Sequence, residues 1–217
     1  MTKETVIIID NSEYCRNTDL LPTRLMSSKN AASTIVNAFC RGEDSVAVVG
    51  TAPATCLSPL SRNQASLLNT VNSLQTGPSY SIINALRIGH LLLKRKPDES
   101  YKGKLVMFIG SPLDGQPEEY FEIARALKKL EVEVCVVTYG ERDQIDRTIS
   151  EFCNVVSSSN YPSCFVPVSQ GGDIDTAVTQ SAFVGGPEAV YNEFEDDPEL
   201  AAAIALSMQT YQADQNL

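Results

Sequence analysis

The stretch TVIIIDNSEYC, residues 5–15, decides the fold class, because a run of β-branched apolar residues ends abruptly on an acid and a polar loop. Runs of this kind are typical of strands that are buried on both faces of a sheet. Similar runs recur along the chain: SVAVVG at 45–50, KLVMFIG at 104–110, VEVCVVTYG at 132–140 and CFVPVS at 164–169. We therefore predict a strand at residues 5–10 and four more downstream.

Segments with a helical spacing of apolar residues separate these runs, at 25–39, 82–93, 120–127 and 145–152. Alternation of strand and helix implies right-handed βαβ units and a parallel sheet covered on both faces. The segment PATCLSPLS, residues 53–61, follows a strand too closely for a parallel crossover, and its prolines fit an edge position. We predict a doubly wound α/β fold with a mostly parallel sheet flanked by helices and one antiparallel edge strand.

Composition narrows the class of protein. The 217 residues are 43% hydrophobic and 20% charged, which is typical of one soluble domain with an appendage. No apolar run reaches the roughly 18 residues that a membrane span needs. The apolar run at the N-terminus is too short for a signal peptide and stops early, at Asp10. Six cysteines are spread singly without a CxxC pair. We expect buried, reduced thiols, with neither a disulfide framework nor a zinc site.

The C-terminal part differs in composition from the rest. Gly185-Gly186-Pro187 is followed by an acidic segment, and residues 188–217 hold seven acids and no lysine or arginine, out of a net charge of −10. We divide the chain into a domain at 1–184, an acidic linker at 185–196 and a helix at 197–211. The acidic tail argues against a nucleic acid partner and favours a partner surface with basic groups.

Few residues in the chain suit catalysis. Neither GxxxxGK[ST] nor GxGxxG follows the first strand, so a nucleotide is not expected. The single histidine, His90, shares a helical face with Ile82 and Leu86 and is expected to pack in or beside the core. Clusters of His and Cys that suit a metal are absent from the sequence. We predict no catalytic residue, no cofactor and no resident metal.

The loop after the first strand allows three interpretations. Asp-x-Ser-x-Ser at this place is the cation-binding loop of von Willebrand factor A domains, but here Asp10 and Ser12 are followed by Tyr14 at the second serine position. The loop after 104–110, where such domains usually supply a second aspartate, reads Gly110-Ser111-Pro112, with Asp114 nearby. An aspartate nucleophile of the haloacid dehalogenase kind requires Asp-x-Asp. The third interpretation is a loop that caps and closes the domain.

The tail has strong signals for a helix. Asp197 before Pro198 supplies an N-cap acceptor and a residue whose φ is already helical. An apolar face recurs at spacings of three and four: Leu200, Ala203, Ile204, Ser207, Met208 and Tyr211. A helix of about 14 residues is marginal alone in water, so it needs a partner surface. That surface is either its own domain or, as the Gly-Gly-Pro break favours, an external partner.

The tail and the body resemble one known family. An acidic segment followed by Leu200-x-x-Ala203-x-x-x-Ser207 is similar to the ubiquitin-interacting motif, with Thr210 where the motif usually has an acid. The body is similar to proteasomal ubiquitin receptors that join a von Willebrand factor A domain to such motifs. The segments that carry this similarity are IIIDNSEYCRNTDLLPTRL, IGSPLDG and ARALKKLEVEVCVVTYGE.

The resemblance implies a non-enzymatic adaptor of the cytoplasm and nucleus. Its A domain is expected to dock on the proteasome regulatory particle between lid and base, while its tail binds ubiquitin and polyubiquitin chains. The residues expected to bind ubiquitin are Glu199, Leu200, Ala203, Ile204, Ser207 and Met208. The candidates for proteasome docking are Asp10, Asn11, Ser12 and Tyr14, with an exposed Asp10 forming a salt bridge to the partner. The alternative is a cation-dependent, ligand-binding A domain with a packed C-terminal helix.

Overall fold

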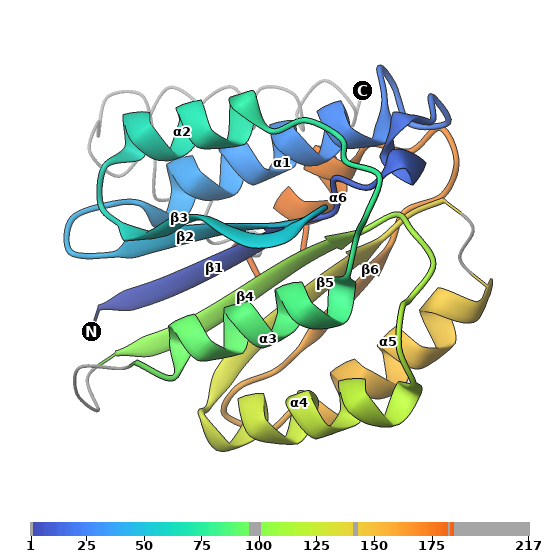
Figure 1. Cartoon of the computed structure of the whole chain (residues 1–217). Coiled ribbons are helices and arrows are strands. Elements are labelled where there is room, and N and C mark those ends of the chain that lie inside the picture. Colours follow the sequence, from blue (N-terminus) through green and yellow to red (C-terminus); the bar gives the residue numbers. More distant parts are fainter. Residues whose placement is uncertain (1, 96–100, 141–142, 182, 185–217) are drawn as a thin grey trace, which may run out of the picture.

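A six-stranded sheet with the order β3-β2-β1-β4-β5-β6 forms the centre of the domain (Figure 1). The computed structural model describes residues 2–95, 101–140, 143–181, 183 and 184. Neighbouring strands are parallel except for β2 and β3, which are antiparallel. The strands are β1 (Lys3–Ile9), β2 (Ser45–Thr51), β3 (Ala54–Ser61), β4 (Lys102–Ile109), β5 (Val132–Thr138) and β6 (Cys164–Pro167). The predicted fold class and the antiparallel edge strand at 53–61 are confirmed.

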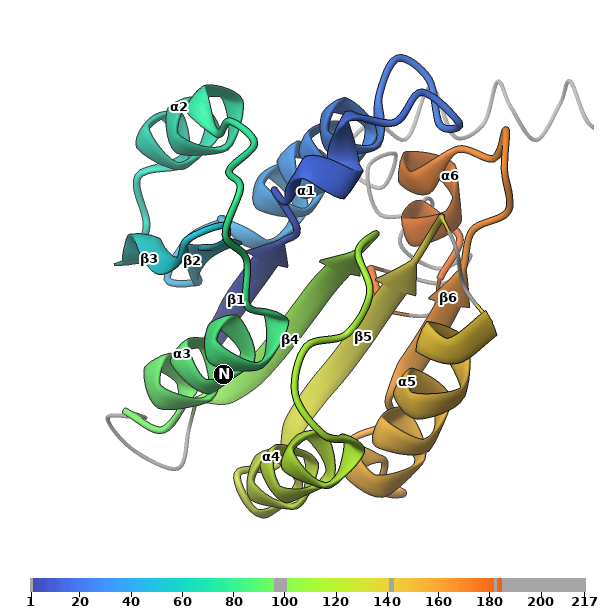
Figure 2. The same ribbon diagram turned by 45° about the vertical axis from the view of Figure 1, so that its right-hand side comes forward.

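Helices cover both faces of the sheet. One face carries α1, α2 and α6, and the other carries α3, α4 and α5, as Figures 1 and 2 show from two directions. Each helical layer encloses its own apolar core against the sheet. The helices are η1 (Glu13–Arg16), α1 (Arg24–Phe39), α2 (Gln64–Ser73), α3 (Ile82–Leu93), α4 (Pro117–Lys129), α5 (Asp143–Val156) and α6 (Ile174–Thr179).

The central strands are buried on both faces, as their continuous apolar runs predict. Residues 6–9 of β1 are at most 1% exposed, with Ile7 and Ile9 in one core and Val6 and Ile8 in the other. Alternation of a strand's side chains between two helical layers requires apolar residues at every position. This requirement explains why the strands read as unbroken apolar runs rather than as alternating patterns.

Side-chain caps fix where several helices begin. The hydroxyl of Thr23 accepts from the Met26 N–H at the start of α1, and Ser81 accepts from the Asn84 N–H at the start of α3. Such caps satisfy backbone N–H groups that have no partner within the helix. In α1 and α3 they place the N-termini beside the carboxyl ends of the strands, where the candidate site lies.

Two helices and one cysteine depart from the sequence-based expectations. The helices α2 and α6 were not predicted from the sequence. In α2 only Leu67 and Val71 are buried, and α6 has six residues, which are too few to show a periodic pattern. His90 is half-buried on α3, as expected. All six cysteines are free thiols, but Cys56 on the edge strand β3 is exposed, so the expectation of buried thiols is wrong for that residue.

The ubiquitin-binding candidates Glu199, Leu200, Ala203, Ile204, Ser207 and Met208 lie outside the described residues, as do the proposed linker and tail helix. The boundaries at 184 and 196 therefore stay predictions. In the part of the chain that the structure describes, no helix combines the length and apolar character needed to cross a membrane.

Candidate functional site

Asp10 lies at the switch point of the sheet, where ligands bind in many open α/β folds. It follows β1 directly, and β1 has β2 on one side and β4 on the other. Its carboxylate accepts from the Ser12 N–H at 3.0 Å and from the Thr51 hydroxyl at 3.1 Å through Oδ1, and from the Gly110 N–H at 2.9 Å through Oδ2. Asp10 is 0% exposed. One carboxylate thus ties together the ends of β1, β2 and β4.

Asn11 uses its whole amide for the same purpose. Its Oδ1 accepts from the backbone N–H groups of Thr51 at 2.9 Å and Ala52 at 2.8 Å. Its Nδ2 donates to the carbonyl oxygens of Ala52 and Gln75, each at 2.8 Å. An amide side chain offers two donors and one acceptor oxygen, and all are engaged here. Asn11 therefore joins the first loop to the β2–β3 turn and to the segment before α3.

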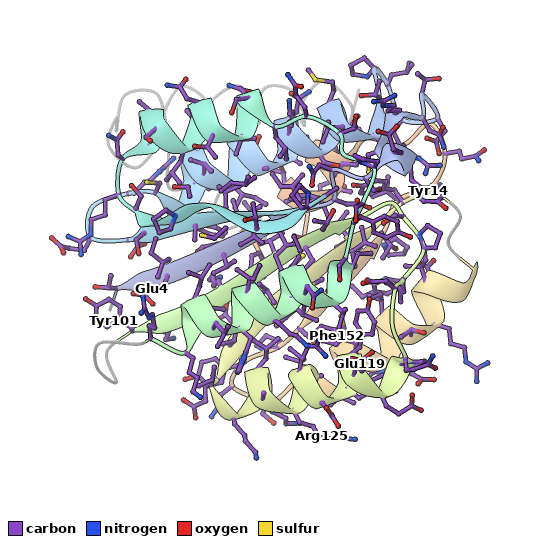
Figure 3. All side chains as sticks on the ribbon, in the orientation of Figure 1. Glu4, Tyr14, Tyr101, Glu119, Arg125 and Phe152 are labelled. Carbon is purple, nitrogen blue, oxygen red and sulfur yellow. The ribbon has the colours of Figure 1, made fainter. Side chains whose placement is uncertain are left out.

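The remaining two docking candidates differ in exposure. Ser12 is 0% exposed, and its Oγ lies 4.0 Å from the Cys15 sulfur. Tyr14 is 45% exposed and meets the ring of Tyr80 edge to face at a centroid distance of 5.9 Å. Figure 3 places Tyr14 at the loop end of the sheet, far from Glu4 at the other end.

The expectation of an exposed Asp10 is wrong. The carboxylate is needed inside the protein, because three strand and loop ends donate hydrogen bonds to it. Of the four docking candidates, Tyr14 alone presents its side chain to solvent. Docking by this loop stays a prediction, and Tyr14 is the one of the four candidates to which a partner has direct access.

The Tyr139 ring packs against Gly110, whose N–H donates to Asp10. Tyr139 follows β5, is 0% exposed, and covers Gly110 so closely that a Cβ at that glycine would lie 2.1 Å from its Cε2. Its hydroxyl lies 2.8 Å from the Ser28 Oγ and 3.9 Å from the Cys15 sulfur. The sequence reading missed this residue. The signal for it was the pair of a glycine after β4 and a tyrosine after β5, since a ring needs a neighbour without a side chain.

Arg24 is a second group that the sequence reading missed. It donates to both carboxylate oxygens of Asp19, through Nε at 2.6 Å and Nη2 at 2.8 Å, and its Nη1 donates to the Gly110 carbonyl at 3.1 Å. A cation in the first turn of a helix opposes the helix dipole, so α1 itself gains nothing from this charge. Its hydrogen bonds instead join α1 to the end of β4, and the ion pair raises the pKa of the guanidinium.

The thiol of Cys15 and the hydroxyl of Tyr139 are held in their neutral forms. Burial raises the pKa of the Cys15 thiol, and the charge of Asp10 raises it further. Burial likewise raises the pKa of the Tyr139 hydroxyl. A thiol needs its thiolate form to act as a nucleophile. This arrangement therefore suits hydrogen bonding and packing, and it offers no activated nucleophile.

The residues present do not fit the cation that Asp-x-Ser-x-Ser loops hold. Both oxygens of Asp10 accept from protein donors, and Tyr14 stands at the position of the second serine with its ring against Tyr80. Asp114 accepts from the Ser81 hydroxyl and from the Ile82 N–H at 2.7 Å, so it caps α3. The described residues contain no group of three or more His, Cys, Asp or Glu side chains arranged for a metal.

The amino end of the sheet holds the root of the tail. Lys104 on β4 forms a 2.6 Å ion pair with Glu133 and donates to the Phe183 carbonyl at 3.4 Å. Its ammonium group lies 5.1 Å from the ring centre of Phe39 and 4.5 Å from that of Phe183. These contacts fix the last described residues opposite the Asp10 loop.

The comparisons agree with this geometry. Residues 5–115 match the family model of the von Willebrand factor type A domain. The chain belongs to this family. The crystal structure of the SpRpn10 VWA domain is similar to this von Willebrand factor type A chain with a TM-score of 0.75 and 24% identity, over 83% of this chain and 96% of the other. BatB from Bacteroides thetaiotaomicron has a TM-score of 0.61 at 18% identity, covering 82% and 95%. Both likenesses show the shared fold.

Several proteins similar in sequence to this von Willebrand factor type A chain are named as regulatory subunits of the 26S proteasome. The 26S proteasome non-ATPase regulatory subunit 4 of Caenorhabditis elegans is 32% identical over 92% of this chain and 63% of its own length. The 26S proteasome regulatory subunit rpn10 of Schizosaccharomyces pombe is 28% identical over 98% of this chain and 91% of its own length. The chain spans 63%, 56% and 52% of the relatives from C. elegans, Drosophila melanogaster and Schistosoma mansoni.

Proposed function

We propose that this chain is a non-enzymatic ubiquitin receptor of the proteasome. Its A domain docks on the regulatory particle between lid and base, and its helix at 197–211 binds ubiquitin chains on substrates. One observation carries the proposal: the similarity to proteasome regulatory subunits covers 98% of the chain in the S. pombe relative, which is more than the body up to residue 184 accounts for. The similarity to this relative therefore includes the tail as well as the body. Such a receptor works where proteasomes are, in the cytoplasm and nucleus.

The filled space around Asp10 supports an adaptor over an enzyme or a cation-dependent binder. The carboxylate at the switch point is occupied by three donors from the protein, and the neighbouring space is filled by the Tyr139 ring. A rigid loop that needs no ligand presents the same surface at all times. Tyr14 on this loop is 45% exposed and is therefore a suitable anchor for a partner. Tyrosines that become buried on binding contribute strongly to the affinity of interfaces.

The position of the last described residues supports separate roles for the body, which docks, and the tail, which binds ubiquitin. Lys104 lies near the start of β4 and Gly110 directly follows its end, so at roughly 3.3 Å per residue the two are about 20 Å apart. Phe183, near the end of the described residues, lies at the Lys104 end, and the Tyr14 loop lies at the other. A linker of about ten residues has a root-mean-square reach of about 18 Å. Docking through the Tyr14 loop thus leaves the tail free to bind ubiquitin.

The affinity of the tail for one ubiquitin is low on physical grounds. Burying a leucine, an isoleucine and a methionine yields at most about 5–8 kcal/mol, from which association and helix ordering subtract several kcal/mol. We expect a Kd on the order of 10⁻⁴ M. Useful capture then depends on polyubiquitin chains or on neighbouring receptors, through effective concentration.

A titration of ¹⁵N-labelled ubiquitin with the full chain tests the tail. We expect chemical shift changes that Leu200→Asp and Ala203→Gln each abolish, because both substitutions disrupt the predicted apolar face. Ala205→Gln makes the same change of size and polarity on the opposite face of the predicted helix and serves as the matched control. Unchanged ubiquitin spectra with the unmodified chain would reject the ubiquitin half of the proposal.

Co-sedimentation with 26S proteasomes tests the body separately. Tyr14→Ala removes an exposed ring at the loop, and Leu91→Ala removes a 59% exposed side chain from α3 as the control. We expect the first variant to be lost from the proteasome fraction and the second to be retained. Asp10→Arg is a poor test, because a cation placed at a 0% exposed position would disturb the fold itself. Retention of Tyr14→Ala would exclude the Tyr14 loop as the docking site.

A further inference from the structure

Two cysteines meet across the edge of the sheet. Cys135 on β5 and Cys164 on β6 are direct partners in the parallel pairing of these strands. Both belong to the apolar cluster on the α1 and α6 face, where Cys135 is 0% exposed and Cys164 is half-buried. Neighbouring strands lie about 4.7–4.9 Å apart, and disulfides join Cα atoms about 4.4–6.8 Å apart. The backbone spacing of this pair therefore suits a disulfide.

We propose that Cys135 and Cys164 form a peroxide-sensitive thiol pair, which oxidation converts to a disulfide that staples the edge strand β6 to β5. This modification site is independent of the proposed ubiquitin and proteasome binding. It lies between β5 and the edge strand β6, whereas Asp10 follows β1.

The surroundings assign different roles to the two thiols. Cys164 is the accessible thiol, and a hydrogen bond from the Cys135 thiol lowers the pKa of Cys164 to about 7. The same hydrogen bond and burial raise the pKa of Cys135. Thiolate character and access determine which thiol reacts with peroxide first. Cys164 therefore reacts first, and Cys135 resolves the product.

The steps balance with hydrogen peroxide as the oxidant. The Cys164 thiolate attacks one peroxide oxygen, the O–O bond breaks, and the sulfenic acid and one water form after proton transfer. The Cys135 sulfur then attacks the Cys164 sulfur, the S–O bond breaks, and the departing hydroxide takes the Cys135 proton to give a second water. Two thiols lose two hydrogens and two electrons, which the peroxide accepts.

Cys153 is the nearest competitor, and its position excludes it as the partner. Its thiol lies 3.9 Å from the Cys164 carbonyl oxygen, but it belongs to the apolar cluster on the α5 face of the sheet. The side chain of Cys164 points to the other face, with Cys135. The proposal thus specifies one pairing of the three that these cysteines permit.

The test uses the full, reduced chain treated with a small excess of hydrogen peroxide, followed by iodoacetamide and mass spectrometry of peptides. Trypsin alone leaves Cys153 and Cys164 together, because no lysine or arginine follows Arg147. Fragmentation of this peptide in the mass spectrometer, favoured at the Tyr161–Pro162 bond, distinguishes a link at Cys164 from one at Cys153. We expect a linked peptide pair that contains Cys135 and Cys164, and the loss of that pair in Cys164→Ser.

Two controls distinguish the proposed route from general oxidation. Cys153→Ala should leave the Cys135–Cys164 link unchanged, and Cys135→Ala should leave a sulfenic acid at Cys164 that dimedone traps. The exposed thiol of Cys56 reports oxidation of an ordinary surface cysteine. A link from Cys164 to Cys153, or dimers through Cys56 without any Cys135–Cys164 link, would overturn the proposal.

Discussion

Asp10→Asn tests whether the carboxylate at the switch point is a structural tie. Its Oδ1 accepts two hydrogen bonds, from the Ser12 N–H and the Thr51 hydroxyl, and its Oδ2 accepts one from the Gly110 N–H. An asparagine has one acceptor oxygen. With that oxygen in the Oδ1 position, the amide NH₂ faces the Gly110 N–H, which is left buried without an acceptor.

The magnitude follows from these three bonds. A hydrogen bond to a charged group contributes about 1.5–3 kcal/mol, and an unsatisfied buried donor costs about 1–3 kcal/mol. Neutralising a buried charge offsets part of this loss, because the burial penalty of the carboxylate disappears. We expect the free energy of unfolding to fall by about 2–3 kcal/mol, which at an m value of about 2 kcal/mol/M lowers the urea midpoint by about 1–1.5 M.

Urea unfolding, followed by circular dichroism, measures the effect with and without millimolar Mg²⁺. Glu43→Gln is the control, since Glu43 pairs with Arg62 at the surface with 76% of its side chain exposed, and such pairs are worth less than about 1 kcal/mol. We expect Mg²⁺ to leave the midpoint of the unmodified chain unchanged. If Asp10→Asn is as stable as the original chain, the carboxylate does not hold the strand ends together, and the reasoning is refuted. A midpoint of the unmodified chain that rises with Mg²⁺ would refute it as well, because it would mean that Asp10 belongs to a cation site.

Three further predictions concern other contacts. Gly110→Ala forces a Cβ into the Tyr139 ring and should lower the free energy of unfolding by about 1–3 kcal/mol, measured by urea titration. Hydrogen bonds from Arg24 lower the pKa of Asp19, so this pair stabilises the fold above the unfolded-state pKa of about 3.9 and the benefit is lost as the pH falls through the folded-state pKa. Asp19→Asn should therefore destabilise the chain at pH 7 and reduce its loss of stability on acidification, as urea midpoints at pH 7 and pH 3 will show. Phe183→Ala removes a ring that is 6% exposed and should lower the free energy of unfolding by about 3 kcal/mol, with earlier cleavage of the C-terminal segment in limited proteolysis.

Most of the fold was predictable because the signal for buried parallel strands is strong. Each predicted strand appears within a few residues of its expected place, since an interior strand requires apolar residues at every position. The antiparallel direction of 53–61 followed from the length of the connection, and its edge position from its prolines. The helices α2 and α6 were not predictable in the same way, because one buries two apolar residues and the other is too short to show a period.

The candidate site was predictable in location but not in composition. The sequence placed Asp10 at the end of the first strand and suggested, as one of three interpretations, a loop that closes the domain. Whether the carboxylate is exposed depends on Thr51 and Gly110, which come from other strands far away in the sequence. The contributions of Arg24 and Tyr139 depend equally on tertiary contacts, and the pair of Gly110 and Tyr139 becomes a signal only once β4 and β5 are known to be neighbours.

The guanidinium of Arg24, held between the Asp19 carboxylate and the Gly110 carbonyl, is a positive charge that the chain carries by covalent bonds. A bound ion occupies its site to a degree set by its concentration, and a chelator removes it. This charge has full occupancy from the moment the chain folds, and no change in the ionic composition of the surroundings alters it. The loop ends that Arg24 connects are therefore held together without calcium or magnesium.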